Sequence, residues 1–245
     1  MNNNYLYELG KWLGDRRGFP RVGIINTELQ LVKDTNRFLE KQFKQKPVLR
    51  KITKKENKTM FGEEAYETFI VSSPIHKRLE NEIQKIKEDI NSLKKKQILS
   101  FLSGFIDAEG TIDLKNDQIV ISVGKKNEEI KELIYLLIKR LEWEVRVWDC
   151  VKEWKISVKS NKEIIKQLKK NVKHPQKKAL LNFNIANADK KYLDYIQNVK
   201  KVKSLDLKQK FCIHEDSARR ILRYFTKLKK IKKITKTRPY VYVPI

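Results

Sequence analysis

The chain has 245 residues, and its 55 Lys and Arg against 30 Asp and Glu give a formal net charge of +25. Two cysteines are too few for a disulfide framework or a zinc site, and no long apolar run predicts a membrane span. We therefore expect an intracellular, cytoplasmic globular protein without a membrane partner, whose partner is a polyanion such as nucleic acid.

Hydrophobic periodicity predicts one order of elements twice. The first run holds helix 5–15, strand 20–26, helix 27–43, strand 46–54, a loop, strand 65–73 and helix 73–94. The second run holds helix 96–108, strands 111–114 and 118–123, helix 127–141, strands 144–149 and 153–159 and helix 161–171. The two runs align with a period of 94 residues. Each unit is too small to cover its own sheet, so we expect the two units to pack side by side.

The C-terminal segment differs from both runs. Residues 190–245 carry 17 Lys and Arg against 4 Asp and Glu, a net charge of +13, while the other 189 residues carry +12. The order helix, helix, turn, helix and β-hairpin predicts a winged helix-turn-helix DNA-binding module. A generic small helical domain with a basic surface is the alternative. We thus expect domains at 1–95, 96–186 and 190–245.

The motif richest in chemistry is FLSGFIDAEG at residues 101–110, an apolar helix that ends in two carboxylates. Small residues spaced four apart would let another helix approach closely; they are Ser100, Gly104 and Ala108 here, and Gly10 and Gly14 in the first unit. Asp15 matches Glu109, so packing through these faces would bring both carboxylates together. Such a pair suits Mg²⁺ or Mn²⁺, which can activate water for phosphodiester hydrolysis.

Residues 102–110, LSGFIDAEG, resemble the signature of the LAGLIDADG family of homing endonucleases, and residues 8–15, ELGKWLGD, resemble a degenerate copy. The resemblance implies an α+β fold, a monomeric pseudo-twofold pair of αββαββα units whose two saddle-shaped antiparallel sheets follow the major groove of double-stranded DNA. It implies that Asp15 and Glu109 are catalytic metal ligands, each cutting one strand. It also implies that Asp107 serves helix structure more often than chemistry.

The first copy departs from the family pattern. Arg16 replaces the glycine after the acid, and Lys11 and Leu13 replace an apolar residue and an Asp. The first strand of the first sheet is shortened to 17–19, which predicts contact with fewer bases. Lys155 is the candidate basic helper near the metals in the second half, with a phosphate contact or a solvated strand residue as the alternatives.

Basic and polar side chains of the predicted strands and the C-terminal segment are candidates for DNA contacts, and base reading and phosphate contact both stay open for them. They are Arg16, Arg17, Arg21, Arg50, Lys51, Lys115, Arg146, Lys159, Ser217, Arg219, Arg220, Arg223 and Arg238.

Three functions fit this sequence. The first is a site-specific, divalent-metal-dependent double-strand DNA endonuclease of the homing type, free-standing and intron-encoded or orphan. The second is a DNA-binding regulator that has lost cleavage, because WhiA-type regulators resemble this layout of a LAGLIDADG-like domain followed by a helix-turn-helix. The third is an RNA-binding maturase, whose partner would be intron RNA.

Overall fold

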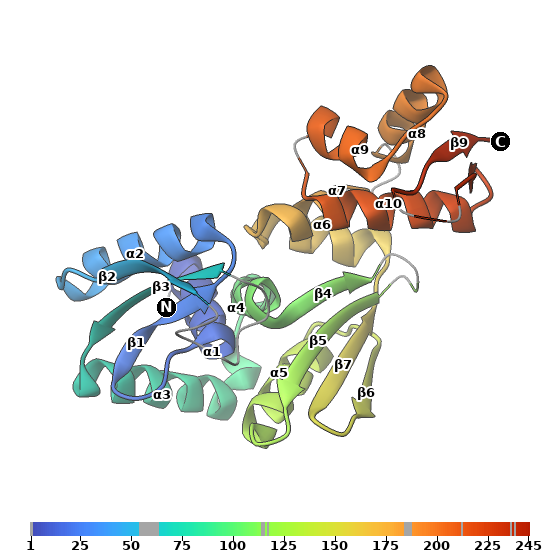
Figure 1. The fold of residues 1–245 in the computed structure, drawn as a ribbon. Helices are drawn as coiled ribbons and strands as arrows, with labels where there is room; N and C mark the ends of the chain where they lie inside the picture. Colours follow the sequence, from blue (N-terminus) through green and yellow to red (C-terminus); the bar gives the residue numbers. More distant parts are fainter. Residues whose placement is uncertain are drawn as a thin grey trace. The chain divides into compact units, whose positions relative to one another are not determined.

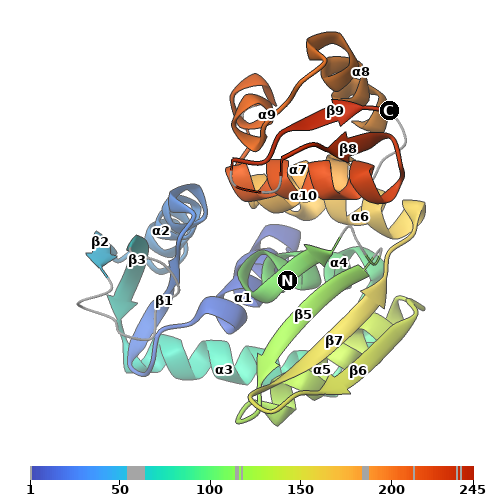
Figure 2. The same cartoon turned by 45° about the vertical axis from the view of Figure 1, so that its right-hand side comes forward.

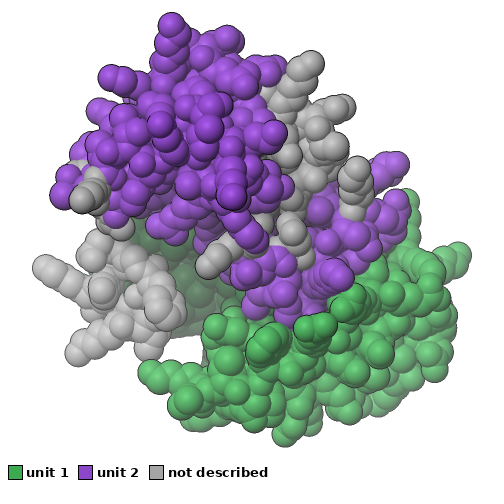
Figure 3. All heavy atoms as spheres, turned by 90° about the vertical axis from the view of Figure 1, so that its right-hand side faces the viewer, with its two compact units in different colours: residues 1–110, 121–156, 171–174 green, residues 111–120, 157–170, 175–245 purple. Residues whose placement is uncertain are grey.

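The computed structural model describes residues 2–53, 64–113, 116, 118–183, 188–211, 213–235, 237 and 239–245. No helix in this described part is long and apolar enough to cross a membrane. The chain divides into two compact units, one of residues 1–110, 121–156 and 171–174 and the other of residues 111–120, 157–170 and 175–245 (Figure 3). The predicted domain boundaries at 1–95, 96–186 and 190–245 stay a prediction.

The first half of the chain forms a three-stranded antiparallel sheet with the order β1-β3-β2. Its elements are α1 (Asn3–Asp15), β1 (Arg21–Asn26), α2 (Leu29–Phe43), β2 (Val48–Thr53), β3 (Glu64–Val71) and α3 (Ser73–Glu88), followed by the short 3₁₀ helix η1 (Ile90–Ser92). The order of helices and strands is the predicted one.

The second half repeats that order around a four-stranded sheet with the order β4-β5-β7-β6 (Figure 2). Its elements are α4 (Lys95–Glu109), β4 (Gly110–Asp113), β5 (Gln118–Gly124), α5 (Glu128–Arg140), β6 (Val145–Asp149), β7 (Glu153–Lys159) and α6 (Lys162–Asn171). In the first half, the place of β4 is taken by one isolated bridge between Arg16 and Ile24. The strand predicted to be shortened in the first half is therefore reduced to this single bridge.

The two faces of the first sheet differ in chemistry. Ile24 and Leu49 both pair with Thr68 across the strands, so the three share one face. That face lies against α2, because Thr68 Oγ1 accepts a hydrogen bond from Nδ2 of Asn36 at 2.9 Å. The opposite face carries Arg21, Arg50, Glu67 and Phe69 by the alternation of strand side chains, and we call it the arginine face.

The C-terminal part contains one helix that the sequence analysis omits. The elements are α7 (Pro175–Phe183), α8 (Ala188–Val199), α9 (Ser204–Phe211), α10 (Glu215–Lys227), β8 (Ile231–Lys233) and β9 (Tyr242–Pro244). The omitted helix is α7, which starts on a proline, a residue that suits the first turn of a helix. β8 and β9 pair antiparallel, and Val202 before α9 bridges to Tyr242 (Figure 2). The two-stranded sheet is thus extended by one bridge to the segment before α9.

Candidate functional site

Helices α1 and α4 pack with their backbones in contact (Figure 1). A Cβ atom placed on Gly10 would lie 2.0 Å from the carbonyl oxygen of Phe101, and one on Gly104 would lie 1.9 Å from that of Tyr7. These distances leave room for hydrogen alone. The small residues that the sequence analysis singled out therefore lie at the contact between the two motif helices, and Ser100 is buried on the same helix as Gly104.

The last turn of each helix brings the two acids to the same end of this contact. A Cβ atom on Gly14 would lie 2.5 Å from Cβ of Ala108 and 3.2 Å from Cγ of Glu109. Glu109 thus extends across Gly14, next to Asp15 in the chain. Nδ2 of Asn26, at the end of β1, donates a hydrogen bond to Oδ2 of Asp15 at 2.6 Å and orients this carboxylate.

The local electrostatics of these helix ends favour a cation. Asp15 and Glu109 are the final residues of α1 and α4, and neither of these two described helices has a basic residue in its last turn. The C-terminus of a helix carries about half a negative charge. Two carboxylates therefore add to two negative helix ends in a chain whose net charge is +25.

The chemistry of the two side chains fits a hard divalent ion. Carboxylate oxygens are preferred ligands of Mg²⁺, which keeps several waters and takes few protein ligands. Asp15 is half-buried and Glu109 is exposed, so both carboxylates lie near solvent. Among the residues that the structure describes, no group of three or more His, Cys, Asp or Glu gathers as a fuller cage. Asp15 and Glu109 therefore stay the candidate ligands for Mg²⁺ or Mn²⁺, and metal binding by them stays a prediction.

The other motif acid, Asp107, is a structural residue in this fold. It is fully buried, and its Oδ2 accepts hydrogen bonds from the hydroxyl of Tyr7 and from the backbone N–H of Lys173, the latter at 2.7 Å. The first bond ties α4 to α1, and the second ties α4 to the segment after α6. Asp107 thereby fixes the helix pair that carries the two terminal acids.

Tyr7 makes the stability of this helix pair sensitive to alkaline pH. Burial raises the pKa of Tyr7 above its usual range, and the negative charge of Asp107 raises it further. The folded state therefore favours the neutral phenol, so its stabilisation is complete below the unfolded pKa of about 10 and is lost as pH rises above it. Between pH 10 and 11, the free energy of unfolding of the wild type should fall by up to about 1.4 kcal/mol more than that of Tyr7→Phe. Thermal melts of both proteins from pH 8 to 11 measure this, and equal pH slopes would contradict it.

The departure at Lys11 is also structural. Lys11, where the second motif has Phe105, is fully buried, and its Nζ lies 2.8 Å from Oε2 of Glu8 one helical turn earlier. The hydroxyl of Thr35 donates a hydrogen bond to the same carboxylate at 3.0 Å. The charge of Lys11 is therefore compensated inside α1 and α2, away from the helix ends that carry the acids.

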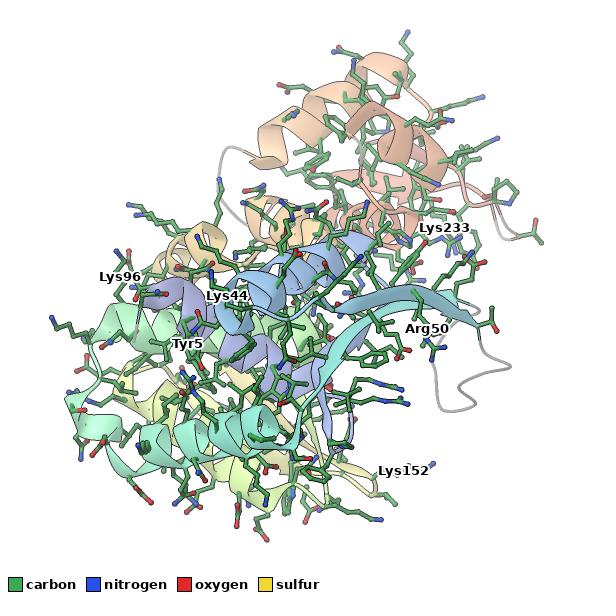
Figure 4. All side chains as sticks on the ribbon, turned by 90° about the vertical axis from the view of Figure 1, so that its left-hand side faces the viewer. Tyr5, Lys44, Arg50, Lys96, Lys152 and Lys233 are labelled. Carbon is green, nitrogen blue, oxygen red and sulfur yellow. The ribbon has the colours of Figure 1, made fainter. Side chains whose placement is uncertain are left out.

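The arginine face gathers two arginines on one buried acid. Nε of Arg50 donates a hydrogen bond to Oε1 of Glu67 at 2.6 Å, and Nε of Arg17 lies 3.1 Å from Oε2. Arg21 stacks over Phe69 with its guanidinium carbon 4.9 Å from the ring centre. Figure 4 shows Arg50 projecting from β2 away from α2. Three predicted DNA contacts thus share this face.

Two further predicted contacts lie elsewhere in the first half. Lys51 pairs across the strands with Tyr66, on the face of Thr68, and its Nζ lies 2.6 Å from Glu64. A hydrogen bond from Lys51 to Glu64 raises the pKa of this lysine. Arg16 stacks over Trp12, with one guanidinium nitrogen 3.6 Å from Glu80 of α3. Neighbouring positions such as Arg50 and Lys51 cannot serve one face, because strand side chains alternate.

The second half keeps three of its predicted basic residues exposed or half-exposed. Arg146 lies on β6 with a guanidinium nitrogen 3.7 Å from Glu144, and Lys159 ends β7 exposed. Lys155, the predicted catalytic helper, lies on β7 with Nζ 3.3 Å from Glu153. Its part in catalysis stays a prediction. The predicted contacts Lys115 and Arg238 lie outside the described residues.

The residues of α10 that were predicted to contact DNA differ in how far they are exposed to solvent. Ser217 is 2% exposed, so this residue is corrected from a DNA contact to a core position beside Ala218. Arg219 is held by Glu215 at 2.6 Å and Asp216 at 3.1 Å. The other two predicted arginines, Arg220 and Arg223, are exposed, and Nη1 of Arg220 donates to the carbonyl of Ile112 at 3.4 Å.

Sequence reasoning missed two residues of the site. Asn26 orients Asp15 across a sequence separation that no local pattern reveals. Glu67 left a signal, because it is an acid inside the strand sequence AYETFIV, on the same strand face as the apolar Ala65 and Phe69.

Comparison with known proteins bears directly on these helices. Residues 96–173 match the model of the LAGLIDADG-like domain. This segment is therefore similar to a LAGLIDADG-like domain. This domain holds the motif helix α4 with Asp107 and Glu109, both sheet hairpins of the second half and α6. A search of curated proteins finds no match.

This chain is similar to several solved structures over most of its length. The homing endonuclease I-DmoI in complex with DNA and Ca is 19% identical, with 74% of this chain and 97% of that chain covered at a TM-score of 0.51. The same endonuclease with DNA and Mn is 19% identical, with 67% and 93% covered at a TM-score of 0.49. Full-length DUF199/WhiA from Thermatoga maritima is 13% identical, with 95% and 93% covered at a TM-score of 0.45. The predicted α+β class with antiparallel sheets is confirmed.

Proposed function

We propose that this protein is a divalent-metal-dependent endonuclease of the homing type that hydrolyses phosphodiester bonds of double-stranded DNA at a specific site. The observation that carries the proposal is the contact of α1 and α4 through Gly14 and Ala108, which brings Asp15 and Glu109 to one end of the helix pair. A bound Mg²⁺ or Mn²⁺ would supply a Lewis acid that generates hydroxide from water and stabilises the leaving oxygen.

The residues of this chain supply position and charge. Asn26 fixes the orientation of the Asp15 carboxylate, and Tyr7 with Lys173 fixes α4 through Asp107. The arginine face supplies cations that neutralise phosphates or contact base edges. Lys155 is the candidate for the basic helper in the second half.

Cleavage of DNA tests the proposal directly. The full chain is incubated with a duplex library carrying a randomised centre and with DNA flanking its own gene, in Mg²⁺, in Mn²⁺ and in a chelator. We expect double-strand cuts at one sequence that disappear with the chelator. Sequence-specific binding without cuts in either metal would favour the regulator instead. Preferential binding of intron RNA would favour the maturase.

The regulator is the second candidate because the first motif departs from the pattern. Arg16 follows Asp15 where the second motif has Gly110, and Lys11 is taken up in a buried ion pair. A metal site built on Asp15 would therefore have a different surrounding from one built on Glu109. Nicking of one strand would show that the Asp15 side has lost activity.

The C-terminal segment is proposed as a winged helix-turn-helix module that adds phosphate contacts through α10. Arg220 and Arg223 lie one turn apart on its exposed side, opposite the buried Ile221, Leu222 and Phe225.

We expect Arg220→Gln and Arg223→Gln each to reduce the slope of log affinity against log salt by about one. Arg219→Gln is the matched control, because Glu215 and Asp216 already occupy this arginine, and it should change the slope less. The slopes come from DNA titrations at several salt concentrations. Equal slopes in all four proteins would contradict a DNA-binding role of α10.

A further inference from the structure

Glu67 is a buried acid on a face proposed to meet DNA. The side chain of Glu67 has 0% exposure, yet it belongs to the arginine face of the first sheet. Arg50 on β2 is the direct cross-strand partner of Glu67 on β3 and donates a hydrogen bond to its carboxylate. Arg17 reaches the other carboxylate oxygen from the segment between α1 and β1.

Stability alone does not account for this arrangement. Burying a carboxylate costs much of its hydration, and an apolar side chain of similar volume is often as stable or more stable at such a position. The next residue on the same face, Phe69, packs beneath Arg21 in that way. An acid on a DNA-facing surface also repels phosphate. Glu67 therefore needs a role that outweighs both disadvantages.

Glu67 contacts the two guanidinium groups in different ways, because it accepts a hydrogen bond from Nε of Arg50 but forms with Arg17 an ion pair that lacks hydrogen-bond geometry. Both arginines approach the carboxylate through Nε, at 2.6 Å for Arg50 and 3.1 Å for Arg17. The planar Nη fork of a guanidinium that is contacted at Nε has the geometry of the O6 and N7 acceptors of guanine. The side chain of Arg50 keeps 50% of its surface exposed, and that of Arg17 keeps 23%.

We infer that Glu67 is a positioning residue, which holds Arg50 and Arg17 so that they read guanine in the duplex target. The inference rests on the proposed function, because the DNA is the ligand. Removal of the Glu67 carboxylate would have two distinguishable effects, one on overall DNA affinity and one on discrimination between bases. Electrostatics alone predicts tighter binding to any DNA, since one negative charge leaves the surface. Positioning predicts weaker discrimination between bases.

The test selects preferred sequences from a duplex library with a randomised centre, using the full-length wild-type protein, Glu67→Gln and Glu64→Gln. Glu64 is the matched control, because it lies on the same strand, is exposed and pairs with Lys51 on the other face. We expect the wild type and Glu64→Gln to select the same sequence. Glu67→Gln should lose guanine preference about tenfold at one or two adjacent positions, with non-specific affinity equal or higher.

Each outcome is decisive. Unchanged base preferences in Glu67→Gln overturn the inference, and so does a uniform fall in affinity with the preferences intact, which would indicate phosphate contacts. A wild type without any sequence preference removes the proposed function itself. If circular dichroism shows that Glu67→Gln does not fold, Arg50→Lys replaces it, since this change keeps the charge and removes the fork. The same loss of guanine preference is then expected, and retained preference overturns the inference.

Discussion

Glu109→Gln is expected to reduce double-strand DNA cleavage by at least about 100-fold while DNA binding stays equal or becomes tighter. The change removes the charge that would hold the metal, and a loss of several kcal/mol of transition-state stabilisation corresponds to this factor. Glu109 is exposed at the end of α4, so the fold should tolerate the amide. Cleavage and binding are measured on the same selected duplex.

Glu88→Gln is the matched control for this change. Glu88 is also an exposed acid at the last position of a helix, α3, and it accepts a hydrogen bond from Gln84. Its cleavage rate should equal that of the wild type. Asp15→Asn should leave a protein that nicks one strand, if each acid serves one strand. Full double-strand cleavage by Glu109→Gln would refute the proposed metal site.

Gly104→Ala is expected to destabilise the protein by about 3 kcal/mol or more. The new Cβ atom would lie 1.9 Å from the carbonyl oxygen of Tyr7 and 2.8 Å from the backbone nitrogen of Lys11. Both are backbone atoms of α1, so no side-chain rotation relieves the overlap, and the helices must separate. A loss of this size lowers the melting temperature by about 6–12 °C in a chain of this length. Thermal unfolding followed by circular dichroism measures it.

Gly18→Ala is the control for backbone and composition effects. Nothing lies within 4 Å of a Cβ atom placed on Gly18, so its melting temperature should stay close to the wild-type value. Separation of the helices in Gly104→Ala should also move Glu109 away from Asp15, and cleavage should then fall further than DNA binding. Equal melting temperatures for the two variants would contradict the close packing of α1 and α4.

Local patterns predicted most elements because helices and strands follow from nearby residues. The errors occur at helix ends and in one short helix. The predicted helix 27–43 begins two residues later, at Leu29 after the cap Glu28, and the predicted helix 73–94 ends earlier, at Glu88. Such boundaries shift because helix ends fray and several polar residues compete to cap a helix start.

The sequence by itself determined the charge and the repeat, and it predicted the partner class and the chemistry to look for. Charge is additive along a chain, so the excess of Lys and Arg is a property of composition alone. The spacing of Gly10, Gly14, Gly104 and Ala108 follows from the period of the helix, which is also local. These features led to Asp15 and Glu109 without any tertiary information.

Only the tertiary structure decided which side chains act together. Arg50 and Lys51 are neighbours in the chain, but the alternation of a strand puts them on opposite faces. Ser217 is buried by the packing of α10, and Glu67 meets Arg17 and Arg50 through contacts across three separate segments. Such contacts depend on strand pairing and on helix packing, which place together residues that no local pattern relates.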